Sequence, residues 1–98
     1  MMKFASAAAL AAAALLAPLS ASAKEKVNLV LNWVPTADHA PYYYAKAQGW
    51  YDAANIDLTI ETGKGSGVSA QRVGAGTSEI GISDLATSLL ARGKGAKL

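Results

Sequence analysis

The residues best able to contact a small ligand are concentrated in one stretch of the chain, residues 27–51. Asn32 and Trp33 end an apolar run, His39 is the only histidine, and Tyr42 opens a run of three tyrosines. An indole can stack on a flat ligand, while a carboxamide offers hydrogen-bond donors and an acceptor. We therefore predict ligand contacts at Asn32, Trp33, His39 and Tyr42.

Each of these residues also has a simpler structural explanation, which the sequence leaves open. Trp33 is equally explained as a core tryptophan beneath the first helix, and His39 as a helix cap. Successive helical residues point about 100° apart, so at most one or two of the tyrosines beginning at Tyr42 can face one cleft. A single histidine without a suitably spaced carboxylate cluster predicts no metal site.

A second candidate region is the glycine-rich loop that ends in Ser66 and Gly67. It lacks the Gly-Lys-Ser/Thr ending of a phosphate-binding loop and does not follow the first strand, so it is not a nucleotide motif. The amides at Ser66 and Gly67 open a predicted helix, whose positive end can hold an anion or a carbonyl group. A mobile turn is the alternative. Asp84 is predicted either to cap a helix or to accept a hydrogen bond from the ligand.

These positions do not assemble into a nucleophile, a base and an orienting group. The chain also has no cysteine, which excludes disulfides, thiolate metal sites and cysteine nucleophiles. We therefore expect no catalytic residues and no cofactor, and a protein that is not an enzyme.

The elements that must position these residues alternate along the chain. Strands are predicted over 27–31, 56–61 and 79–82, and helices over about 39–48, 68–73 and 84–91, with Ser66 as an N-cap. This order predicts an α/β fold with three parallel strands and right-handed crossovers. Ligands of such sheets bind beyond the carboxyl ends of the strands, where Asn32 and Trp33 lie. In the last helix we expect the leucines to face inward: Leu85, Leu89 and Leu90.

Residues 1–23 have the pattern of a secretory signal peptide. A basic start at Lys3 precedes an apolar run over 4–17, and small residues lead to a predicted cleavage after Ala23. The run is too short and too rich in alanine for a span of about 20 apolar residues. We therefore expect a periplasmic protein that does not insert into the membrane after cleavage.

Residues 24–98 hold eight of the nine basic residues, Lys3 being the ninth, and all seven acidic residues. That balance predicts neither nucleic acid nor an anionic membrane as a partner. Three strands and three helices bury only a small core at this length. We expect residues 24–98 to be an incomplete domain.

Three short motifs carry a resemblance to a known family: Asn32-Trp33-x-Pro35, His39-Ala40-Pro41 and Gly49-Trp50-Tyr51. Together they resemble the N-terminal region of periplasmic substrate-binding proteins of ABC transporters, in the NMT1/THI5-like group related to nitrate, sulfonate and taurine binders. The resemblance implies that residues 24–98 are the first part of lobe one of a type II periplasmic-binding-protein fold, and that the second lobe is absent.

The resemblance further implies capture of a small planar solute, such as a thiamine pyrimidine precursor, and its delivery to a membrane permease. Asn32 and Trp33 would line the pocket. A sulfonate, taurine or nitrate binder is the alternative within this class, with the anion held at Ser66 and Gly67. The eukaryotic relatives are enzymes that synthesise the pyrimidine with a lysine after the third strand and a histidine four residues later. Ser83 and Thr87 stand at these positions, so the resemblance favours transport over synthesis. An inert truncated product is a further alternative.

Overall fold

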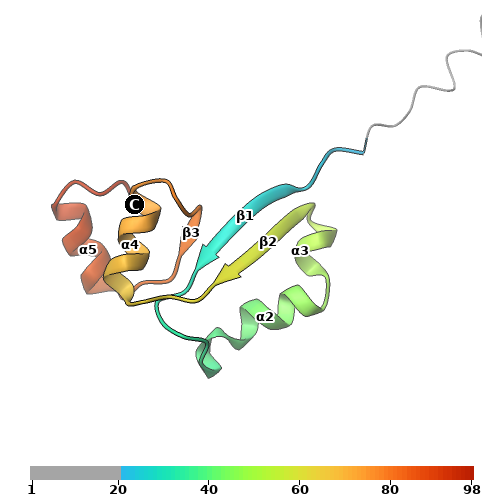
Figure 1. Cartoon of the computed structure of the whole chain (residues 1–98), viewed down its shortest axis with the longest axis horizontal. Helices are drawn as coiled ribbons and strands as arrows, with labels where there is room; N and C mark the ends of the chain where they lie inside the picture. The colour runs from blue at the N-terminus through green and yellow to red at the C-terminus, as the bar shows by residue number, and fades with distance from the viewer. Residues whose placement is uncertain (1–20) are drawn as a thin grey trace, which may run out of the picture.

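A three-stranded parallel sheet organises residues 21–98, the part of the chain that the computed structural model describes (Figure 1). Strand β1 (Glu25–Val30) lies between β2 (Ile56–Glu61) and β3 (Ile80–Gly81), and both pairings are parallel. This confirms the α/β class with three parallel strands alternating with helices, as in part of a periplasmic-binding-protein-like lobe. The signal-peptide prediction falls almost entirely outside the described residues.

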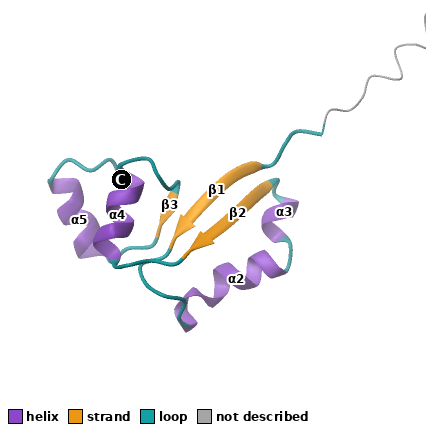
Figure 2. Cartoon of the chain, in the orientation of Figure 1, coloured by secondary structure: helices purple, strands orange, loops and turns teal. Residues whose placement is uncertain are grey.

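The strand pairing brings the carboxyl ends of the strands to one edge. The register runs from Glu25 opposite Ile56 to Val30 opposite Glu61, so β1 and β2 end together. Loops leave both arrowheads on the same side (Figure 2). β1 ends one residue earlier than predicted, and β3 has two residues where four were expected.

Within residues 21–98, five helical segments connect and flank the strands. They are the 3-10 helix η2 (Ala37–His39) and the α-helices α2 (Ala40–Ala47), α3 (Trp50–Ala53), α4 (Ser66–Gly74) and α5 (Leu85–Gly93). Gly49 ends α2 with a φ of 74°, a left-handed conformation that glycine adopts without steric cost. Asn55 has a φ of 62° before β2, as expected for a residue type that tolerates this region.

The helices cover both faces of the sheet. On one face, Leu29 and Leu58 form the core with Leu31, and Tyr42 of α2 packs against them. Side chains alternate between faces along a strand, so Val30 and its partner Gly81 point to the other face. A Cβ on Gly81 would lie 2.6 Å from Ser69 Oγ of α4, so α4 covers that face.

Two local predictions are wrong. The leucines of α5 were expected to face inward, but Leu85, Leu89 and Leu90 are 74%, 57% and 66% exposed. Their helix packs chiefly against α4, which leaves its other sides uncovered by the described residues. Ser66 is not the N-cap of α4. Gly65 takes that position with a φ of 112°, and Ser66 is the first helical residue.

Across the described residues, 21–98, every helix is too short or too polar to cross a lipid bilayer.

A backbone seam joins the loop after β1 to the loop after β2. The Gly63 N–H donates to the Trp33 carbonyl oxygen at 3.0 Å, and the Gly65 N–H donates to that of Asn32 at 2.7 Å. The two segments of backbone approach so closely that a Cβ on Gly63 would lie 1.7 Å from the carbonyl oxygen of Leu31. Only glycine fits at position 63.

We predict that Gly63→Ala lowers the free energy of unfolding by about 3 kcal/mol, the upper part of the range for overpacking, because backbone must move to admit the methyl group. Gly67→Ala is the matched control, since nothing lies within 4 Å of a Cβ there and alanine favours a helix. Urea unfolding of both variants measures the difference. Equal stabilities would contradict the close approach at Gly63.

Candidate functional site

The carboxyl edge of the sheet gathers three segments that are far apart in the sequence. Asn32 and Trp33 follow β1, the glycine-rich loop follows β2, and Asp84 follows β3. Gly65 is hydrogen-bonded to Asn32, and Ser66 is hydrogen-bonded to Asp84. The predicted site residues at the strand ends are therefore linked by a continuous set of contacts.

Most polar side chains at the junction between α4 and α5 are hydrogen-bonded to groups of the same junction. The Ser66 hydroxyl accepts from the Asp84 N–H at 3.0 Å, and the Ser83 hydroxyl donates to the Ser66 carbonyl at 3.2 Å. Asp84 caps α5, accepting the Thr87 N–H at 2.8 Å and the Thr87 hydroxyl at 2.5 Å. Hydrogen bonding by the Thr87 hydroxyl, then by the Thr87 N–H, holds the pKa of Asp84 below its usual value. Ligand contacts at Ser66, Gly67 and Asp84 remain predictions.

The polar group next to the seam is a pair formed by Asn32 and His39. His39 Nε2 lies 2.8 Å from Asn32 Oδ1, and His39 Nδ1 lies 3.1 Å from the Thr36 backbone nitrogen. The Thr36 hydroxyl bonds to the Asp38 carboxylate. The His39 side chain is 2% exposed, whereas Asn32 is half-buried, so the asparagine is the more accessible member of the pair. Ligand contact at His39 stays a prediction.

The aromatic residues predicted to contact a ligand differ in how exposed they are. Trp33 is 57% exposed, so in this structure it is not a core residue and its ring is accessible at the strand end. Tyr42 is half-buried against the core cluster, whereas Tyr43 and Tyr44 are exposed. The structure thus exposes Trp33 at the candidate site, whereas Tyr42 packs from α2 against the core.

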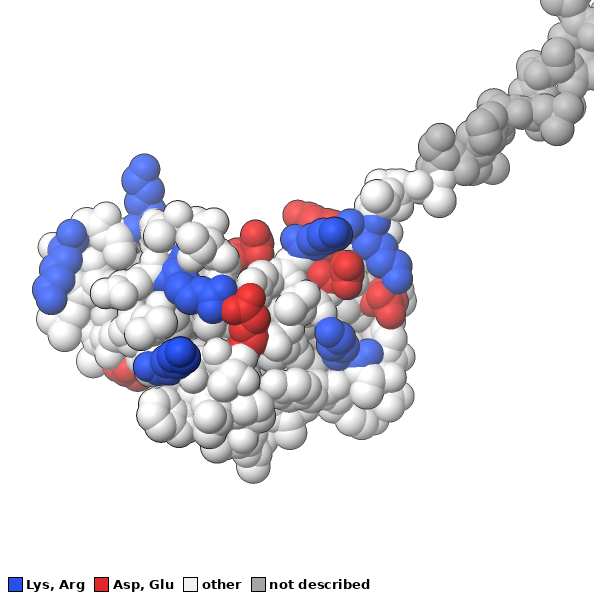
Figure 3. Space-filling model, in the orientation of Figure 1, with Lys and Arg blue, Asp and Glu red and all other residues white. Residues whose placement is uncertain are grey.

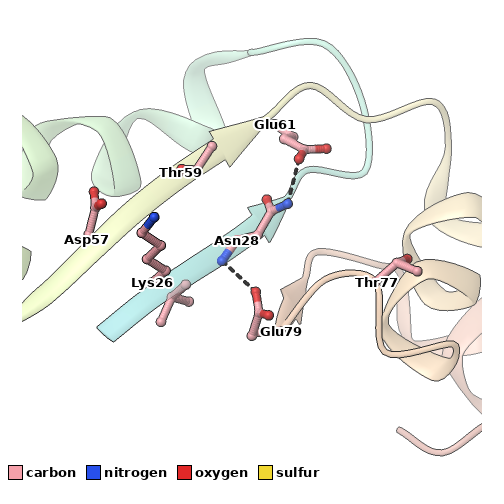
Figure 4. Close-up of a pocket in the computed structure, with 8 residues that line it drawn as sticks. Lys26, Asn28, Asp57, Thr59, Glu61, Thr77 and Glu79 are labelled. Atoms are coloured by element: carbon pink, nitrogen blue, oxygen red, sulfur yellow. Dashed lines mark hydrogen bonds between the residues drawn. The ribbon is translucent and has the colours of Figure 1, made fainter. Parts of the chain in front are cut away.

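Sequence reasoning missed a polar hollow of about 430 Å³ along β1 and β2 (Figure 4). Asn28 lies at its centre. Its side-chain amide donates to Glu61 at 2.5 Å, and its backbone N–H donates to the Glu79 carboxylate at 2.7 Å. Glu79 replaces a strand partner here, because β3 is too short to reach Asn28. Polar residues alternate with apolar ones in both strands, and this pattern could have indicated the hollow. Only the strand register shows that the polar residues of the two strands lie on the same face of the sheet.

One of the carboxylates that line this hollow, that of Glu61, forms a salt bridge with Arg72. Arg72 bonds to Glu61 at 2.5 Å, and this bond, followed by that from Asn28, holds the pKa of Glu61 below its usual value. Basic and acidic side chains are interspersed on the face shown in Figure 3. Within residues 21–98, His, Cys, Asp and Glu form no group of three or more that could hold a metal ion.

Comparisons with known proteins agree on one family. The family model described as NMT1/THI5 like matches residues 36–98. The chain is 31% identical over 74 residues to a 4-amino-5-hydroxymethyl-2-methylpyrimidine phosphate synthase of Legionella pneumophila, covering 76% of this chain and 23% of that protein. Synthases of the same name from Candida albicans and Saccharomyces cerevisiae are 27% identical over 70 residues and 25% over 71. These matches cover 71% and 72% of this chain, and 21% of each synthase.

These names contradict the expectation that the protein is not an enzyme. The expectation relied on the missing catalytic groups of residues 24–98, yet the chain spans only about a fifth of the length of these relatives. A bacterial relative carries the same name as the fungal ones, so synthases are not confined to eukaryotes. The absence of catalytic groups from so short a part of such proteins was therefore not enough to predict that the protein is not an enzyme.

We predict that the Asp84 cap stabilises the fold in a pH-dependent way. The pKa of Asp84 is lowered below 3.8, its ordinary value. Its contribution is therefore fully present above pH 3.8 and is lost as the pH falls through the lower value of the folded state. Urea unfolding should show wild type more stable than Asp84→Asn at about pH 6, and this difference in stability should narrow as the pH falls below 3.8. A gap that persists in acid would contradict a role for the carboxylate charge.

Proposed function

The chain belongs to the NMT1/THI5-like family, and we propose that its carboxyl sheet edge forms one wall of a binding site for the 4-amino-5-hydroxymethyl-2-methylpyrimidine unit. The observation that carries this proposal is the exposed indole of Trp33 directly after Asn32, at the end of the central strand. An aromatic ring stacks on a flat heterocycle, and the neighbouring carboxamide can pair with the ligand's polar edge.

Synthesis of the pyrimidine phosphate is the activity to test first, because the relatives that match over about 70 residues are named for it. Enzymes that use pyridoxal phosphate hold it through a lysine. At the position where the resemblance places that lysine, Ser83 donates a hydrogen bond to Ser66, and Thr87, in place of the histidine, bonds to Asp84. These side chains do not fit a covalently held pyridoxal phosphate.

Capture of the pyrimidine for an ABC importer is the second candidate, and Ser83 and Thr87 favour it. In this case the protein would work in the periplasm and deliver the solute to a membrane permease. Recognition of the pyrimidine is common to both candidates. A sulfonate or taurine binder would instead place an anion at the start of α4, where Ser66 and Gly67 supply backbone N–H groups.

The binding wall predicts different outcomes for the two tryptophans. Trp33→Ala should weaken binding of 4-amino-5-hydroxymethyl-2-methylpyrimidine by about tenfold or more, the usual loss when a stacking aromatic is removed. Trp50→Ala is the matched control. Trp50 is 59% exposed, close to the 57% of Trp33, but it opens α3 at the amino end of β2, where it packs edge-on against Tyr44.

Titration of the full chain followed by amide NMR shifts detects even weak binding. Equal losses in the two tryptophan variants, or binding of taurine and alkylsulfonates alone, would contradict the proposed wall. The absorbance of the purified protein after incubation with pyridoxal phosphate then separates the two candidates. Retained pyridoxal phosphate supports synthesis, and pyrimidine binding without it supports solute capture.

A further inference from the structure

We propose that His39 is a positioning residue that holds the Asn32 carboxamide with its NH₂ group toward the ligand. The site would then select ligands that present a hydrogen-bond acceptor at this point. The inference rests on the proposed pyrimidine site for its ligand, but its structural basis is a set of contacts within the chain.

The protonation of the imidazole follows from its neighbours. A backbone N–H can only donate, so the Thr36 N–H, at 3.1 Å, requires His39 Nδ1 to be an acceptor. The Thr36 hydroxyl lies 3.2 Å from the same atom, but its hydrogen is directed to the Asp38 carboxylate. A proton on Nδ1 would therefore meet the Thr36 N–H donor to donor. The neutral ring carries its hydrogen on Nε2.

The orientation of Asn32 follows in turn. The Nε2–H of His39 donates to Asn32 Oδ1 at 2.8 Å. Carboxamide orientation is assigned from the hydrogen-bond network, and here a flipped Asn32 would set its NH₂ group against the Nε2–H. The oxygen thus faces the buried histidine, and the NH₂ group faces away from it. The Asn32 backbone is fixed as well, because its carbonyl accepts from Gly65.

An oriented NH₂ group determines which ligand atom can lie beside it. An unprotonated ring nitrogen of an aminopyrimidine accepts this hydrogen bond, while an amino or N–H group at the same place leaves two donors unpaired. Sites that hydrogen-bond a polar group discriminate strongly against ligands that lack the matching partner. His39 would therefore influence specificity without touching the ligand.

The tautomer can be measured without any ligand. His39 is the only histidine in the chain, so the ring nitrogens in a ¹⁵N NMR spectrum belong to it alone. We expect an unprotonated Nδ1 and a protonated Nε2 at neutral pH. A proton on Nδ1, or a doubly protonated ring, would overturn the proposal whatever the chain binds.

Two substitutions separate positioning from loop support. In His39→Gln the amide nitrogen reaches about the place of Nε2 and can still donate to Asn32. In His39→Asn the side-chain oxygen lies near the place of Nδ1, so it can accept from Thr36 but cannot reach Asn32. We expect the affinity of His39→Gln for the aminopyrimidine to stay within about threefold of wild type. In His39→Asn it should fall about tenfold, because one orienting hydrogen bond is lost.

The opposite ranking of the two variants, or equal losses, would show that His39 only supports the loop and would overturn the proposal. If neither variant folds, the wild-type tautomer decides the question. If the wild-type chain has the expected tautomer but does not bind the aminopyrimidine, the pyrimidine site fails while the orientation of Asn32 stands. The two failures are therefore distinguishable.

Discussion

The backbone seam between the end of β1 and the glycine-rich loop is the contact on which the candidate site depends. Two N–H groups, those of Gly63 and Gly65, donate to the carbonyl groups of Trp33 and Asn32. These bonds extend the pairing of β1 with β2 past the strand ends, where the parallel ladder has stopped. They fix the backbone of both candidate ligand residues. The Trp33 indole then projects from a rigid position and is accessible without a change in fold.

Most polar groups at this edge already have partners within the protein. Asp84 caps a helix, Ser66 and Ser83 bond to each other's segments, and the Thr87 hydroxyl is held by Asp84. Besides the backbone N–H groups at the start of α4, what remains available is an exposed indole and one oriented carboxamide. The indole and the carboxamide suit a flat heterocycle, because stacking supplies contact area and a single donor sets orientation.

Local chemistry predicted much of this structure, and long-range packing accounts for the errors. The alternation of strands with helices followed from local residue patterns, and the left-handed residues Gly49 and Asn55 are of types that tolerate this conformation. The exposure of the α5 leucines did not follow in this way, since it depends on what else packs there. The hollow around Asn28 needed the register of two strands. The bond between His39 and the Thr36 N–H has the spacing of a capping box, but the burial of His39 depends on how the loop after β1 packs. The expectation of a non-enzyme failed for another reason, because the chain spans about a fifth of its relatives.

The steric limit at Gly63 also bears on protein engineering. One loop carries Asn32, Trp33 and His39 and could be mistaken for a unit that can be transplanted alone. Its geometry, however, is held by a second segment, the glycine-rich loop after β2. A transplant into another scaffold would need both segments, delivered in parallel register, with a glycine where a Cβ would lie 1.7 Å from a carbonyl oxygen. Libraries that diversify this recognition element should therefore keep position 63 constant and vary the exposed neighbours of Trp33, such as Val34.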